Sequence, residues 1–70
     1  MNKYMLQKLA ARIKELRKKK GLTQDDLAYY SNIPRSTIGH IETAQNDVVF
    51  SKVVAIANAF GLSLSDFLNF

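Results

Sequence analysis

The side chains best suited to chemistry lie between Arg35 and His40. An arginine can donate two hydrogen bonds to O6 and N7 of guanine, the commonest base-specific contact in the major groove of DNA. His40 can donate to a guanine acceptor, and the Ser36 hydroxyl can donate or accept. Thr37 can reach a phosphate or a thymine methyl group. We therefore interpret Arg35, Ser36, Thr37 and His40 as candidate base-reading residues.

A second group of polar residues is suited to phosphate contacts. Gln24 comes one residue into an expected helix, where free backbone N–H groups bind phosphate and the side-chain amide can add a donor. The lysines before Gly21 occupy the last turn of another expected helix, where they also offset the helix dipole. The candidate phosphate contacts are Lys18, Lys19, Thr23, Gln24, Thr43 and Asn46.

Two short helices must position these residues. Thr23 is a candidate N-cap, and Asp25 and Asp26 place negative charge in the first turn that follows. The segment 31–34, Ser-Asn-Ile-Pro, then breaks the helix, because asparagine tolerates left-handed backbone angles and the residue before proline avoids the α region. A second helix starts near Pro34 and turns Ile38 and Ile41 inward. Two helices joined by such a short turn form a helix-turn-helix.

Three further helices complete an all-α pattern. An apolar stripe at helical spacing predicts a first helix over about residues 5–20. A fourth helix over about residues 49–60 is expected to bury Phe50 and four later residues, and Ser63 is expected to cap a short last helix. The stripe residues are Leu6, Leu9, Ile13 and Leu16 in the first helix, Phe50, Val53, Ile56, Ala57 and Phe60 in the fourth, and Leu64, Phe67 and Leu68 in the last.

The length and composition of the chain restrict the classes of protein to which it can belong. Seventy residues make one small domain, 1–70, whose stability is marginal without efficient packing or a partner subunit. The absence of cysteine removes disulfides and zinc sites, and with one histidine and no glycine-rich phosphate loop we expect neither an enzyme nor a metal or other cofactor. No apolar run approaches the roughly 20 residues of a membrane span. We expect a cytoplasmic protein without a membrane partner.

The charge is concentrated at one end of the chain. Residues 1–20 hold eight basic residues and one acidic residue, whereas residues 21–70 hold two basic and five acidic residues. A positive segment of this kind suits a polyanionic partner, although a solvated helix face is the simpler interpretation of a basic run.

The segment 21–42, GLTQDDLAYYSNIPRSTIGHIE, resembles the DNA-binding domain of phage repressors and Cro proteins, the XRE family. Asn32 replaces the usual glycine of the turn, and Ala44 and Val48 replace a usual glycine and proline beyond it. The resemblance covers about residues 6–68. The residues that match are Gly21, Leu22, Thr23, Gln24, Leu27, Ala28, Ile33, Ile38, Ile41 and Glu42.

The resemblance implies a compact five-helix, lambda-repressor-like fold that binds double-stranded DNA sequence-specifically. It implies that Gln24 holds the DNA backbone and that Arg17 forms a structural ion pair with Glu42. It also implies a transcriptional regulator, either a small stand-alone repressor or a restriction-modification-type controller. An antitoxin-type module that binds another protein through its acidic second half is the alternative.

We expect a homodimer that binds a palindromic operator, because one recognition helix spans only a few base pairs and two must lie about 34 Å apart along the DNA. Several apolar residues remain after the core is assigned, and a contiguous exposed group of this kind often marks an interface. The candidate interface residues are Val48, Val49, Val54, Leu64 and Phe70.

Overall fold

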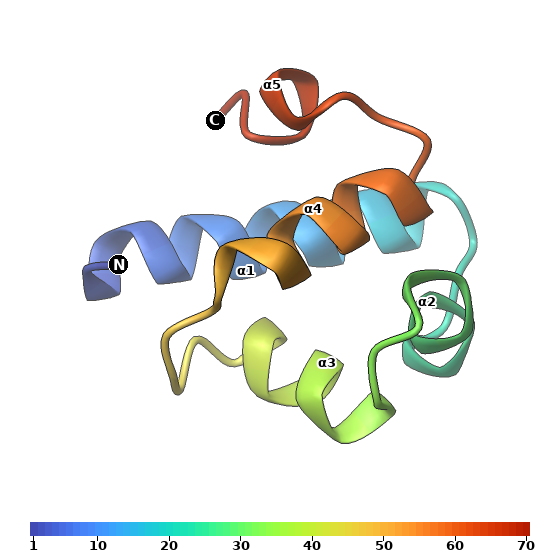
Figure 1. Cartoon of the computed structure of the whole chain (residues 1–70), viewed down its shortest axis with the longest axis horizontal. Helices are drawn as coiled ribbons and strands as arrows, with labels where there is room; N and C mark the ends of the chain where they lie inside the picture. Colours follow the sequence, from blue (N-terminus) through green and yellow to red (C-terminus); the bar gives the residue numbers. More distant parts are fainter.

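Five α-helices follow one another along residues 1–70 in the computed structural model (Figure 1). Their bounds are α1 Lys3–Lys19, α2 Gln24–Ser31, α3 Arg35–Glu42, α4 Phe50–Ala59 and α5 Leu64–Phe67. The prediction of an all-α chain with five helices is confirmed, with boundaries that differ by one or two residues. None of these helices is both long and apolar enough to cross a bilayer.

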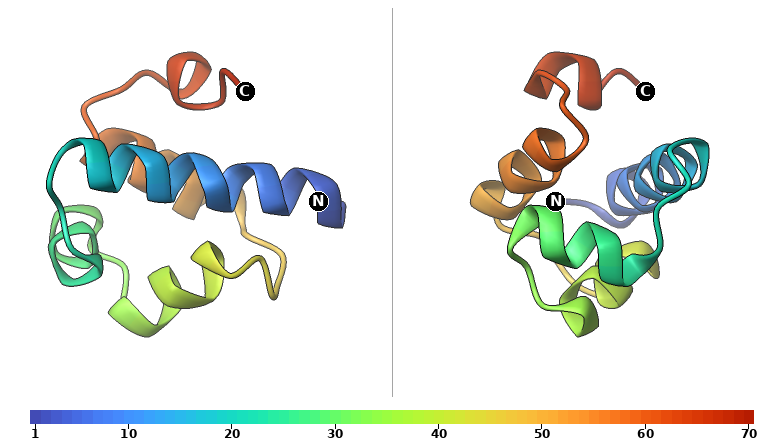
Figure 2. Two further views of the ribbon diagram at one scale, coloured as in Figure 1. Left: turned by 180° about the vertical axis from the view of Figure 1, so that it is seen from behind. Right: turned by 90° about the vertical axis from the view of Figure 1, so that its right-hand side faces the viewer.

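The helices are arranged around α1 and α4. Figures 1 and 2 show α2 and α3 together on one side of these two helices and α5 on the opposite side. All five helices contribute to one core: Leu9 and Ile13 of α1, Leu27, Ile38, Ile56 and Phe67 are each less than 2% exposed. The helix-turn-helix is therefore held as one face of a packed body.

Side chains at the helix starts satisfy free backbone N–H groups. The Thr23 hydroxyl accepts a hydrogen bond from the Asp26 N–H, and the Asp26 carboxylate accepts one from the Thr23 N–H, at 3.0 and 2.9 Å. The bond from the Thr23 backbone N–H to the Asp26 carboxylate is the main cause that lowers the pKa of Asp26 below its ordinary value of 3.8, and the Thr23 side chain adds to it. Because the folded pKa is the lower one, this stabilisation is present above pH 3.8 and is lost as the pH falls through the folded pKa. Ser63 caps α5 in the expected way.

Four helices end at a residue with left-handed backbone angles. Gly21 and Gly61 follow α1 and α4, and Asn32 makes the turn between α2 and α3 with φ 58°. Ala44, at φ 56°, follows α3. Its N–H bonds the Ile41 carbonyl at 3.1 Å and the Gln45 N–H bonds the His40 carbonyl at 3.4 Å, as in a Schellman motif. Alanine thus takes the conformation that the family usually gives to glycine, at a steric cost of about 1–2 kcal/mol.

The prediction for Phe50 is wrong. Val53, Ile56, Ala57 and Phe60 are buried as expected, but Phe50 is 64% exposed. Phe50 is the first residue of α4, and helical side chains lean toward the N-terminus of their helix. Its ring therefore extends past the start of α4 rather than onto the core.

A contact that the sequence did not indicate joins α1 to α5. The Arg12 guanidinium donates from Nε to the Phe67 carbonyl at 3.0 Å and from Nη2 to the Asp66 carbonyl at 2.9 Å. Helix ends leave carbonyl groups without partners. Arg12 gives the Phe67 carbonyl a partner and adds a second bond to the Asp66 carbonyl, which also accepts from the Asn69 N–H at 3.3 Å. It so fastens the shortest helix to the longest.

Candidate nucleic-acid interface

The outer face of α3 carries the candidate base-reading residues. Ile38 and Ile41 are buried, so the helix is fixed about its axis by its apolar side. Arg35, Ser36 and His40 are exposed, and Thr37 is half-buried. The short turn before α3 is itself anchored, because Ile33 is buried and the Ser31 hydroxyl donates to the Leu27 carbonyl at 2.7 Å. The polar face of α3 is therefore presented outward on a rigid support.

An ion pair joins α1 to the end of α3. Arg17 donates from Nε and Nη2 to the two carboxylate oxygens of Glu42 at 2.9 and 3.2 Å, and from Nη1 to the Leu22 carbonyl at 2.9 Å. The Glu42 side chain is only 3% exposed. The pair expected from the resemblance is present, and its bidentate geometry fixes the orientation of α3 against α1.

Gln24 belongs to the same network. Its side-chain amide donates to a Glu42 carboxylate oxygen at 3.2 Å, which uses one of the two amide hydrogens. A Cβ atom added at Gly39 would lie 4.0 Å from the Gln24 Oε1 atom, an ordinary contact distance. Nothing within the chain therefore requires glycine at position 39, although a glycine there leaves space between α2 and α3.

The other candidate phosphate contacts lie at helix ends around this face. Thr23 is engaged in the α2 cap, and the Thr43 hydroxyl donates to the His40 carbonyl at 3.0 Å. Lys18 and Lys19 are exposed in the last turn of α1 and take part in no ion pair of the structure. Figure 1 shows that this end of α1 leads directly to α2.

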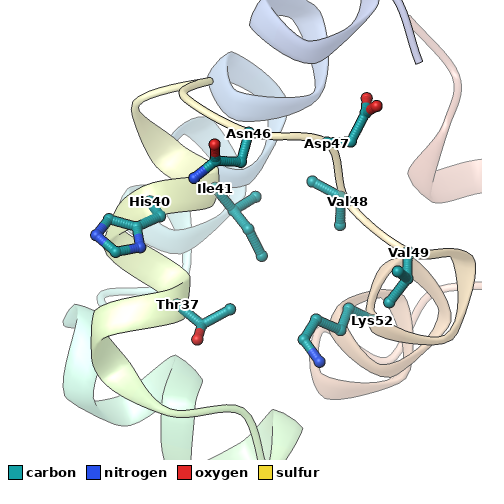
Figure 3. Close-up of a pocket in the computed structure, with 8 residues that line it drawn as sticks. All are labelled: Thr37, His40, Ile41, Asn46, Asp47, Val48, Val49 and Lys52. Atoms are coloured by element: carbon teal, nitrogen blue, oxygen red, sulfur yellow. The ribbon is translucent and has the colours of Figure 1, made fainter.

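A pocket of about 180 Å³ lies between α3 and the start of α4. Figure 3 shows Thr37 and His40 on α3, Asn46 in the connecting loop, and Lys52 extending from α4 toward α3. The pocket thus brings together three predicted contact residues from α3 and the loop. Lys52 is not among the predicted contacts, because only the packing of α4 against the helix-turn-helix places it there. The pocket is lined by Thr37, His40, Ile41, Asn46, Asp47, Val48, Val49 and Lys52.

The structure also places Asp25 against Arg35. The Asp25 Oδ1 atom lies 3.3 Å from the Arg35 Nε atom, and both side chains are exposed. The two residues belong to different helices, so the periodicity of neither helix indicates the contact.

The candidate interface residues have two different environments. Val48 and Leu64 pack against the core and Val54 is half-buried, so much of their apolar surface is already covered. Val49 and Phe70 remain 59% and 41% exposed. Phe50 and Leu68 are exposed as well, so the uncovered apolar residues lie at the start of α4 and after α5.

Two short helices joined by a tight turn, with the second exposing a polar face, define a helix-turn-helix DNA-binding regulator. The chain belongs to the HTH_3 helix-turn-helix family, whose model matches residues 13–67.

Solved structures of this class superpose on the whole fold. The restriction-modification controller protein C.AhdI from Aeromonas hydrophila is 34% identical with a TM-score of 0.84, over 89% of this chain and 94% of that one. C.Esp1396I, solved as a tetramer with its natural 35-base-pair operator, is 33% identical with a TM-score of 0.88, over 94% and 87%. An HTH_3 regulator from Vibrio cholerae is 25% identical with a TM-score of 0.91, over 99% of this chain and 39% of that one. No curated protein sequence matches the chain.

Proposed function

We propose that the chain is a transcriptional controller of the restriction-modification type, which binds a palindromic operator as a homodimer with α3 in the major groove. The observation that carries this proposal is the polar face of α3, held outward by two buried isoleucines and by the Arg17–Glu42 pair. The similarity to controller proteins over nearly the full length of both chains supports the controller role.

Base reading rests on the exposed residues of α3. Arg35 at the first position of the helix, Ser36 and His40 are exposed, and Thr37 is half-buried. Gln24 retains one free amide hydrogen for a phosphate, and the last turn of α1 adds two lysines a few residues before it. We propose a cytoplasmic location, because a protein that binds an operator must reach the DNA it regulates.

Selection of bound sequences from random duplex DNA tests the proposal. We expect an enriched palindrome with two half-sites about 10 base pairs apart.

Arg35→Ala should lose preference at one base pair of each half-site and weaken operator binding by about 1–3 kcal/mol, because it removes a bidentate contact. Binding and preference equal to the parent would contradict the assignment of Arg35.

The antitoxin-type alternative predicts a different result. In that case affinity capture would return one stable protein partner, and the chain would show no retention on operator-sized duplex DNA. Enrichment of a palindrome by the purified chain, with no stable protein partner captured, would favour the controller over the antitoxin-type module.

A further inference from the structure

Asp25 is an acidic residue on a surface proposed to meet a polyanion. It is the second residue of α2, and its carboxylate lies 3.3 Å from the Nε atom of Arg35, the first residue of α3. The ion pair therefore bridges the turn of the helix-turn-helix at the end of α3 where base contacts begin. Asp26, the neighbouring acid, is engaged in the α2 cap and faces Thr23 instead.

We infer that Asp25 is a positioning residue for base reading: it orients Arg35 toward a guanine and opposes binding where that guanine is missing. This inference rests on the proposed function, since it assigns a role to a residue beside the reading arginine.

The geometry of the guanidinium supports the orienting role. The group carries five donors in one plane. The Asp25 carboxylate lies closest to Nε, at 3.3 Å, so the outer edge of the guanidinium, between its two terminal amino groups, remains available for O6 and N7 of guanine. A long arginine side chain also loses rotamer freedom on binding, and a residue that restricts it beforehand reduces that loss.

The charge of Asp25 supports the second role. The side chains of Asp25 and Arg35 are 80% and 60% exposed, so in the free protein water screens the pair and the pair contributes little to folding. When DNA excludes water, charge interactions strengthen. On a DNA sequence that lacks the guanine, Arg35 makes no base contact, and the Asp25 carboxylate is repelled by the DNA phosphates. Asp25 therefore weakens binding to incorrect sequences more than binding to the correct one, which is specificity obtained through repulsion.

Asp25→Asn tests the inference, because it removes the charge and keeps the shape. The affinities of the parent and the variant are measured for the selected operator, for its three substitutions at the base pair that Arg35→Ala identifies, and for random duplex. We expect the discrimination at that base pair to fall about fivefold, toward the lower end of what a bidentate arginine provides. Affinity for random duplex should rise, and the thermal unfolding midpoint should fall by no more than a few degrees, since Asp25 also places negative charge in the first turn of α2. Asp25→Glu should restore the discrimination.

Glu15→Gln is the matched control. Glu15 is an exposed acid of α1, so the variant has the same change of net charge away from the reading face. It should raise the affinity for all duplexes alike and leave the discrimination unchanged.

The outcomes separate this inference from the proposed function. If Arg35→Ala shifts the preference but Asp25→Asn leaves the discrimination as in the parent, the role of Asp25 is refuted and the proposed function stands. An equal loss of discrimination in Glu15→Gln also refutes it, because net charge alone would then explain the effect. If the parent selects no sequence, the proposed function fails and the inference fails with it.

Discussion

At the scale of single residues, Glu42 is the most demanding position of the chain. It is a buried carboxylate whose two oxygens receive bonds from Arg17 and Gln24. Buried charges are costly unless they are paired, and removal of one partner leaves the other poorly solvated. In a domain of this size, with little stability in reserve, that cost is a large fraction of the total.

A double-mutant cycle measures the coupling free energy between Arg17 and Glu42. Arg17→Met and Glu42→Gln should each lower the free energy of unfolding by about 3 kcal/mol, and the two losses together should exceed that of the double variant by about 1–3 kcal/mol. Urea denaturation followed by circular dichroism gives these values. The Arg12–Glu15 pair, in which Arg12 is half-buried and Glu15 is exposed, is the control, with an expected coupling below about 0.5 kcal/mol. Strictly additive losses for Arg17 and Glu42 would show that the contact does not stabilise the fold.

At the scale of helices, the ends of α1 and α3 differ in the residue at the left-handed position. The end of α1 has glycine there, whereas the end of α3 has Ala44 at φ 56°. The loop that follows α3 carries Asn46 and leads to the pocket beside the reading face. Strain at this position therefore adjoins the proposed DNA contact.

Ala44→Gly should stabilise the protein. Glycine removes the steric cost of the left-handed conformation and loses more entropy on folding, so the net gain should be about 0.5–1 kcal/mol. A thermal unfolding midpoint higher by several degrees is expected for a domain of this size. Ala11→Gly is the matched control: Ala11 is exposed inside α1, so the same change should cost about 1 kcal/mol there. A lower thermal unfolding midpoint for Ala44→Gly would show that the left-handed conformation of Ala44 is not strained.

The two lysines in the last turn of α1 should contribute to the salt dependence of DNA binding. Lys18→Ala with Lys19→Ala should weaken binding to operator and to random duplex alike, and should reduce the slope of log affinity against log salt by about 0.9 for each phosphate that these lysines neutralise. Filter binding between about 50 and 200 mM salt covers the range in which such slopes are measured. Lys3→Ala with Lys8→Ala removes the same charge from the other end of α1. Equal slopes for the two variants would exclude Lys18 and Lys19 from the interface.

At the scale of the whole molecule, the uncovered apolar residues bear on self-association. Val49 and Phe50 at the start of α4 and Phe70 at the chain end are exposed, while Val48 and Leu64 are partly taken into the core. Among the proposed dimer-contact residues, Val49 and Phe70 therefore offer the most uncovered apolar surface, and Val48, Val54 and Leu64 offer less.

Sedimentation equilibrium at tens of micromolar tests this contact. The parent should give twice the 7.9 kDa mass of one chain. Val49→Asp should give the mass of one chain and bind operator more weakly, because it buries a charge in the interface. Val49 is also the N-cap of α4, where aspartate is favoured, so the variant should remain folded. Tyr29→Asp changes an exposed aromatic residue of α2 and should stay dimeric. A parent that keeps the mass of one chain, with and without operator DNA, would refute the dimer.

The sequence by itself determined the helices and the face of α3 that carries the proposed base-reading residues. Thr23, Asn32 and Ser63 act on backbone groups within a few residues of themselves, and the isoleucines of α3 recur at helical spacing. Local hydrogen bonds and periodicity are encoded where they act, so they can be predicted from neighbours in the chain. The Arg17–Glu42 pair was expected only from the family resemblance.

Only the tertiary structure decided the features that join distant residues. Arg12 reaches carbonyls 54 and 55 positions away, Asp25 meets Arg35 across the turn, and Lys52 borders the pocket beside α3. The exposure of Phe50 likewise depends on where the packed part of α4 begins. These contacts follow from how the helices pack against one another, and the spacing of residues within one helix carries no information about its neighbours.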